Sequence, residues 1–162
     1  MLRSLFKERP SLERYKELIE DILSGLGIDP DRNREETGRD KEYSWLLQRG
    51  SAVVYVELLG EEEEGYFMVD CPILTLPSTN QEGFFRRLLE LNDQLVEATL
   101  TLRGSEVHLL GIRPLRGMDA GEAEEMIDRI SGYADNLDNQ LSSEFGAPLW
   151  TGKNDAWPQA VD

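Results

Sequence analysis

His108 and Cys71 are the only histidine and the only cysteine of the 162-residue chain, so nucleophilic chemistry of the thiolate–imidazole kind would have to use this pair. Cys71 alternates with Phe67 and Val69 on one side of a predicted strand, which favours a buried and inert thiol. Transition-metal sites need more ligands than one histidine and one cysteine. The chain also lacks a phosphate loop, a Gly-x-Ser-x-Gly elbow and a Cys-x-x-Cys pair. We therefore expect no catalytic activity, no cofactor and no bound metal.

The polar segment between Asp29 and Lys41 places oxygen ligands at a different spacing. Five of its side chains match positions 1, 3, 5, 7 and 12 of a calcium-binding loop, namely Asp29, Asp31, Asn33, Glu35 and Asp40. Position 6 requires glycine for a sharp turn, but Arg34 stands there, and a strand is expected next instead of a helix. A solvated loop is favoured. A small-ligand or ion-binding regulatory sensor remains the alternative function.

The charge balance narrows the classes of partner. The chain has 17 Lys and Arg against 32 Asp and Glu, for a net charge of −15. Nucleic acids and anionic membranes would be repelled, whereas a basic or amphipathic protein segment would be attracted. Glu61–Glu64 adds four like charges at an expected hairpin tip, where they would act as a solubilising turn or as a handle for a basic partner. No apolar run reaches the roughly 20 residues of a membrane helix, and no signal peptide is evident, so we expect a cytoplasmic protein.

The elements that must position these residues follow from hydrophobic periodicity. Stripes at helical spacing predict three helices, and alternating or β-branched runs predict five strands. The expected helices span about 12–26, about 81–92 and about 120–145, and the expected strands span 43–49, 52–59, 66–74, 96–103 and 106–113. Gly50-Ser51 and Gly104-Ser105 have the glycine that a type II′ hairpin turn requires. Asp119 and Glu122 form the pattern of a helix-capping box.

The resulting order, α-β-β-β-α-β-β-α, predicts an α+β fold: a two-layer sandwich with an antiparallel sheet and the helices on one face. We expect a single domain over 1–162, with its core at about 11–145 and a tail at 146–162. Because βαβ repeats are missing, a doubly wound nucleotide-binding fold is not expected.

An excess of apolar strand residues is the main functional signal. Tyr43, Trp45, Leu46 and Leu47 place hydrophobic side chains on both faces of one strand, and 53–56 do the same on the next. A two-layer fold covers only one face of its sheet. The other face should be covered by a second subunit, by a client protein, or by the tail with Trp150 and Trp157.

The element order and acidity resemble the class I type III secretion chaperones and the related YbjN-like proteins. The resemblance spans about residues 11–145, with local stretches at 66–72, at 85–92 (FRRLLELN) and at 107–112 leading through Asp119 into the last helix. It implies a non-catalytic homodimer that holds an extended or partly folded client. The polar loop after Asp29 and the tryptophan-bearing tail depart from the compact pattern of these chaperones.

The resemblance also implies positions for the binding surfaces. Client contacts would involve the first helix or the exposed strand face: Leu12, Tyr15, Ile19, Trp45 and Tyr55. Dimer contacts would involve the second helix near Phe84 and Leu88. The sequence does not identify the partner.

Overall fold

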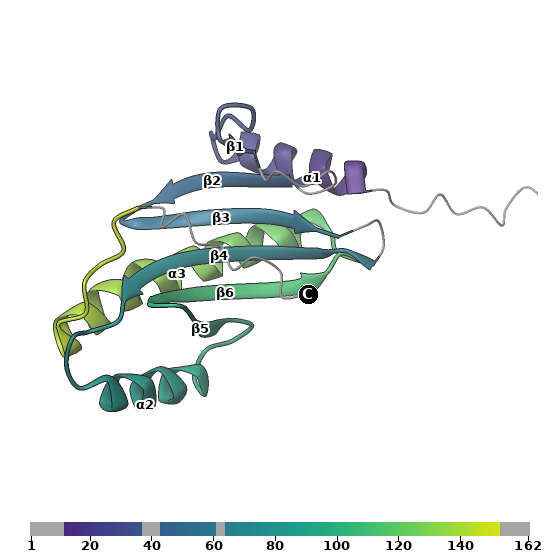
Figure 1. The fold of residues 1–162 in the computed structure, drawn as a ribbon. Helices are drawn as coiled ribbons and strands as arrows, with labels where there is room; N and C mark the ends of the chain where they lie inside the picture. The colour runs from purple at the N-terminus through teal and green to yellow at the C-terminus, as the bar shows by residue number, and fades with distance from the viewer. Residues whose placement is uncertain (1–11, 37–42, 61–63, 153–162) are drawn as a thin grey trace, which may run out of the picture.

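The computed structural model describes residues 12–36, 43–60 and 64–152, which build a six-stranded antiparallel sheet in the order β1-β2-β3-β4-β6-β5 (Figure 1). The strands are β1 (Arg34–Glu35), β2 (Tyr43–Arg49), β3 (Ala52–Leu59), β4 (Tyr66–Thr75), β5 (Thr99–Arg103) and β6 (Glu106–Pro114). Every neighbouring pair is antiparallel. The predicted antiparallel sheet is thereby confirmed.

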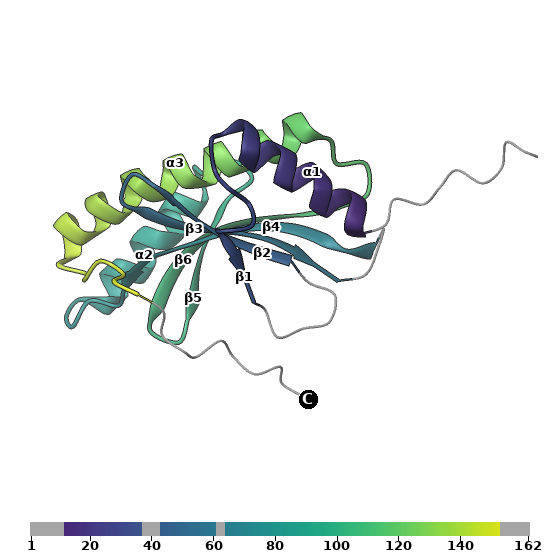
Figure 2. The ribbon, with the colours of Figure 1, turned by 90° about the horizontal axis from the view of Figure 1, so that it is seen from above.

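In the part of the chain that the structure describes, three helices accompany the sheet: α1 (Leu12–Gly25), α2 (Gln81–Asn92) and α3 (Ala120–Phe145). Figures 1 and 2 show α1 and α3 on the same face, with α2 beyond the edge strand β5. The opposite face, here called the helix-free face, has no helix over it in the described part of the chain. This two-layer α+β arrangement is the predicted one. No helix within the described ranges is both long and apolar enough to cross a membrane.

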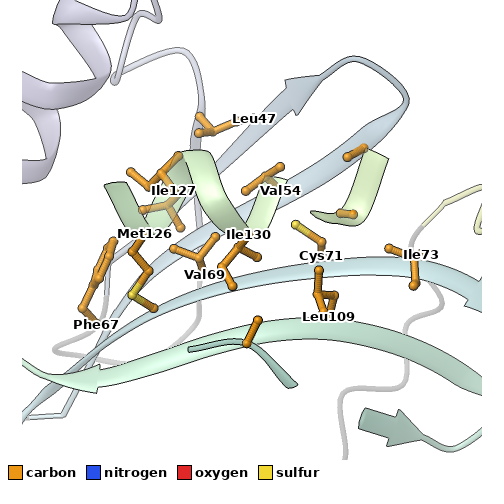
Figure 3. Packing of buried hydrophobic residues seen from close by; sticks show 14 of the residues in the cluster. Leu47, Val54, Phe67, Val69, Cys71, Ile73, Leu109, Met126, Ile127 and Ile130 are labelled. Atoms are coloured by element: carbon orange, nitrogen blue, oxygen red, sulfur yellow. The ribbon is translucent and has the colours of Figure 1, made fainter. Parts of the chain in front are cut away.

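The long helix α3 provides most of the cover. Its first turn is closed by the predicted capping box, in which the Asp119 carboxylate accepts from the Glu122 amide at 2.8 Å and the Asp119 amide donates to the Glu122 side chain at 3.0 Å. Its 26 residues extend for about 39 Å. Figure 3 shows Ile127 and Ile130 above the strand residues of the core, and both are fully buried.

The β2–β3 hairpin is tied to α3 through its turn. Gly50 and Gly104 both have φ 59, in agreement with the predicted turn type. The Ser51 amide and hydroxyl donate to Asp135 at 3.0 and 2.9 Å, and the hydroxyl also lies 2.9 Å from Asp138. A Cβ at Gly50 would lie 2.5 Å from the Asp135 carboxylate, so a larger residue here would have to displace that side chain.

Two local expectations need correction. The segment after Asp29 contains the short strand β1, which pairs Arg34 with Trp45 and adds a sixth strand to the five that were predicted. Strand β5 begins at Thr99 instead of Val96, because Glu97 has φ 51 and interrupts the extended chain.

Candidate protein-binding surfaces

Apolar side chains gather on the helix-free face of the sheet. Cross-strand register places Leu46 opposite Tyr55, and Met68 opposite Ile112. Tyr66 and Ile112 expose 46% and 53% of their surface, respectively. We call this surface the helix-free patch: Leu46, Tyr55, Leu59, Tyr66, Met68, Leu110 and Ile112. Apolar residues grouped in this way are typical of interaction sites, whereas isolated surface hydrophobics need no explanation.

A buried polar cluster lies beside the patch. Asp70 is 2% exposed and His108 is 7% exposed. The His108 Nδ1 atom lies 3.0 Å from one Asp70 oxygen, and the Arg103 guanidinium donates to the other. A buried carboxylate is stable only with such partners, and the cluster contains no serine, cysteine or lysine nucleophile. Its chemistry is that of a structural ion pair within the sheet.

Cys71 belongs to the opposite face of the same strand. Its side chain points into the core below α3 (Figure 3), whereas its neighbour Asp70 faces the other way. Burial, with a further contribution from the Asp70 charge, raises the pKa of the Cys71 thiol far above its ordinary value. The sheet therefore separates Cys71 from His108, and a thiolate–imidazole pair is not formed.

The start of the predicted tail is built into the sheet. Leu149 bridges to Leu74, the Thr75 amide donates to the Pro148 carbonyl at 2.9 Å, and the Trp150 amide donates to the Ile73 carbonyl at 3.0 Å. The Trp150 indole donates to Glu106 at 3.0 Å. Trp157 lies outside the described residues. The tail was one of three possible covers for the second face, beside a second subunit and a client, and its described part reaches only the end of β4 and the neighbouring Glu106.

Four of the predicted partner-binding residues are buried in the hydrophobic core. Leu12, Tyr15 and Ile19 are at most 9% exposed and belong, together with Trp45, to the hydrophobic core. They hold α1 against the sheet. Tyr55 differs, because it is only half-buried and lies within the helix-free patch.

Polar contacts also hold α1 against β2. The Tyr43 hydroxyl donates to Glu13 at 2.6 Å, and Lys16 donates to the same carboxylate at 2.8 Å. These two donors, Lys16 first, lower the pKa of Glu13. Arg34 of β1 lies over the Tyr43 ring at 4.7 Å and faces Glu20 at 3.6 Å. Residues from α1, β1 and β2 are thus joined at one edge of the molecule.

The second helix divides its apolar residues between core and surface. Phe84 and Leu88, predicted at a dimer interface, are buried, and Phe84 packs edge-on against Phe145 at 5.3 Å. Phe85 and Leu89 instead expose 36% and 71% of their surface. Their four-residue spacing makes them neighbours along the helix. We call this pair the α2 ridge.

An open groove of about 680 Å³ runs along the same side of α2. Leu89 contributes apolar surface to it, and Arg86, Arg87 and Glu90 contribute charges. Arg87 is also held by Glu144 of α3 at 3.4 Å. The groove therefore combines one residue of the ridge, Leu89, with charged groups of both signs, a composition suited to a protein surface.

The candidate calcium loop is occupied by its own hydrogen bonds. The Asp29 carboxylate accepts from the amides of Asp31 and Arg32 at 3.1 and 3.3 Å, and Arg32 lies 3.4 Å from it. Glu35 belongs to β1, and Asp40 lies outside the described residues. Within the described ranges, no group of three or more acidic, histidine or cysteine side chains is placed to hold a metal ion.

Comparison with known proteins identifies the fold. No protein family model matches the sequence, and no curated protein matches it. A chain of the ExsC–ExsE complex covers 80% of this chain and 95% of its own length, with a TM-score of 0.58 and 16% identity. A chain of the HopA1–SchA chaperone–effector complex covers 77% of this chain and 93% of its own length, with a TM-score of 0.52 and 12% identity. The chain therefore has a type III secretion chaperone-like fold, as its element order predicted.

Two features, one buried and one exposed, escaped sequence reasoning for different reasons. The cluster of Asp70, Arg103 and His108 joins three strands, and no spacing along the chain indicates it. The α2 ridge had a detectable signal, because Phe85 and Leu89 follow Phe84 and Leu88 by one residue each. Both pairs have helical spacing, so the sequence cannot tell which of them faces the core.

Proposed function

We propose that this chain is a non-catalytic, chaperone-like domain that holds a partner protein or an extended client peptide on the helix-free patch. The observation that supports it best is the apolar surface around Tyr55 and Ile112, in a fold shared with chains from partner-bound complexes. Apolar strand faces without a helix layer are stabilised by covering them. Client binding supplies such a cover without any chemical step.

The proposed partner is an apolar segment flanked by basic residues. The chain's net charge of −15 attracts a cationic partner over several ångströms and speeds its encounter. Apolar contacts on the patch then provide most of the affinity. A relation to the YbjN-like proteins and a cytoplasmic location belong to the same proposal and rest on the sequence alone.

The proposal includes a homodimer, with contacts at the α2 ridge. Phe85 and Leu89 are exposed, whereas the originally predicted Phe84 and Leu88 support them from the core. The side chain of Asn92 bonds both main-chain groups of Leu100, at 2.7 and 3.2 Å, which fixes α2 against β5. A ridge held in this way is a preorganised surface for a second copy.

The α1 residues have an indirect role in this proposal. Leu12, Tyr15 and Ile19 position α1, and Trp45 supports it from β2, while Tyr55 contacts the client directly. Substitutions in the first group should therefore reduce stability before they reduce binding.

Affinity capture with three baits tests the client proposal. Wild type, Ile112→Lys and Leu89→Lys are compared, with bound proteins identified by mass spectrometry and then cross-linked to the bait. We expect Ile112→Lys to lose the partner and Leu89→Lys to keep it, because the two side chains lie on different surfaces. A partner that binds all three baits equally, or that cross-links only away from the patch, would refute the proposed binding surface.

Light scattering on the same variants tests the dimer. Wild type and Ile112→Lys should have twice the mass of one chain, and Leu89→Lys should have the mass of one chain. A monomeric wild type at high concentration would remove the homodimer from the proposal and leave the client site to its own test.

A further inference from the structure

Strand β4 extends beyond the end of its pairing with β3. Along the β6 edge the pairing continues to Thr75, opposite Glu106. Along the β3 edge the pairing ends at Asp70, opposite Tyr55. The last part of β4, from Cys71 to Thr75, therefore has an edge that β3 does not cover. Sheet edges of this kind accept an extended chain through main-chain hydrogen bonds.

The chain's own residues Pro148–Trp150 occupy that edge. Two main-chain hydrogen bonds join them to Thr75 and Ile73, and Leu149 lies opposite Leu74 in antiparallel register. The geometry shows that the edge accepts an extended segment and how it orients that segment.

Few buried contacts keep residues 148–150 in place. Leu149 exposes 42% of its surface and Trp150 is half-buried, whereas Ala147 just before them is 1% exposed. Gly146 ends α3 in a left-handed conformation (φ 66), so the helix does not continue into the segment. A short strand with few buried contacts belongs to the part of a protein that opens locally before the rest unfolds.

The side chain of Glu106 makes the edge selective for a segment with an N–H donor at one position. The Trp150 indole N–H donates to Glu106 Oε1 at 3.0 Å, and the second Glu106 oxygen lies 3.4 Å from His108 Nε2. Glu106 therefore presents an oriented acceptor for an N–H donor at one position of the added strand. An extended peptide that places an indole at this position would match both the edge and the acceptor.

We propose that the β4 edge from Ile73 to Thr75 is a strand-acceptor site, occupied in the free protein by Pro148–Trp150 and filled in the complex by an extended partner segment with a leucine–tryptophan-like pair. The inference rests on the proposed protein-binding function and names a second point of contact for the partner. The chain's own segment acts as a competitor that the partner displaces.

The test uses the full-length chain and a labelled synthetic peptide with the sequence of residues 146–152. Two variants release the native segment by different means: Trp150→Ala removes the indole, and Trp150→Pro also removes the N–H that donates to Ile73. We expect the peptide to bind both variants at least tenfold more tightly than it binds wild type. The same peptide with alanine in place of its tryptophan should bind at least tenfold more weakly, and Glu106→Leu added to Trp150→Ala should weaken binding of the parent peptide.

Hydrogen exchange at Thr75 decides between the remaining outcomes. Its amide should exchange faster in both variants and should be protected again by the peptide. If neither variant accelerates the exchange, the segment is not displaceable, and the inference is wrong. It is equally wrong if exchange accelerates but the peptide does not bind. Because the probe is the chain's own sequence, these results do not depend on finding a natural client or a dimer.

Discussion

Both faces of the sheet carry apolar side chains, but the two sets are buried to different extents. On the helix-covered face, Val54, Val69 and Leu109 are fully buried beneath α3 (Figure 3). On the helix-free face, Tyr66 and Ile112 stay about half exposed, and the deepest group is the charged Asp70. Hydrophobic burial therefore stabilises the fold mainly from one side. The other side retains apolar surface that a partner can cover.

Truncation in the core should show the largest difference between the faces. Ile127→Ala removes a fully buried side chain that contacts the sheet, so it should lower the free energy of unfolding by about 2–5 kcal/mol. Ile112→Ala, on the helix-free face, is the matched control and should change it by about 0.5 kcal/mol or less. Urea unfolding measures both. Equal losses would mean that the helix-free face is already covered in the free protein.

The charged cluster should be the one costly position on the helix-free side. Asp70→Asn keeps the shape of the side chain but leaves Arg103 without its buried counter-charge, with an expected loss of about 2–3 kcal/mol. Asp128→Asn is the control, because its pair with Arg49 is exposed and should contribute at most about 1 kcal/mol. If both substitutions cost the same, burial does not distinguish the two ion pairs.

The two hairpin turns allow a smaller and sharper comparison. Gly50→Ala and Gly104→Ala both place a side chain at φ 59, which costs roughly 1–2 kcal/mol. The Gly50 variant should be the less stable, because its Cβ would displace Asp135, whereas no atom lies within 4 Å of a Cβ at Gly104. Thermal unfolding of the pair measures the difference. Identical midpoints would show that Asp135 moves away freely.

The smallest expected effect is on the acid sensitivity of the β2–β3 turn. The Ser51 amide, and after it the Ser51 hydroxyl, lowers the pKa of Asp135. A carboxyl whose pKa is lower in the folded state contributes stability above its unfolded pKa, and this contribution is lost as pH falls below about 4. Ser51→Ala should shift the Asp135 pKa part of the way back towards its ordinary value, since the amide remains. NMR titration measures the shift.

Ser105→Ala provides the control for this titration, because Ser105 holds the same position in the other hairpin. It should leave the Asp135 pKa unchanged. An unchanged pKa in Ser51→Ala as well would mean that the hydroxyl has no part in the shift and that the amide alone accounts for it.

Local chemistry accounts for the elements that could be predicted. The boundaries of β2, β3 and α2 follow from alternation, glycine turns and helical spacing, all of which act over a few residues. Strand β1 could not be predicted in this way. Its two residues, Arg34 and Glu35, have no apolar pattern, and they become a strand because β2 offers an edge beside them.

The candidate sites depend on contacts between residues that lie far apart in the sequence. Tyr55 could be placed on a strand face from its alternation with Val54 and Val56, and it lies on the exposed face. The choice between Phe84 and Phe85 needed the position of Phe145, which lies far along the chain and packs against Phe84. The contact between Trp150 and Glu106 joins the tail to β6 in the same manner.

The sequence by itself determined the order of the elements other than β1, the turn types, the capping of α3 and the acidic charge, because each depends on neighbouring residues or on composition. Only the tertiary structure decided which apolar face receives α1 and α3, where Asp70 finds its counter-charge and which strand edge Pro148–Trp150 fills. Those outcomes depend on burial and hydrogen bonding between segments far apart in the chain, where several arrangements satisfy the same local pattern and packing selects one.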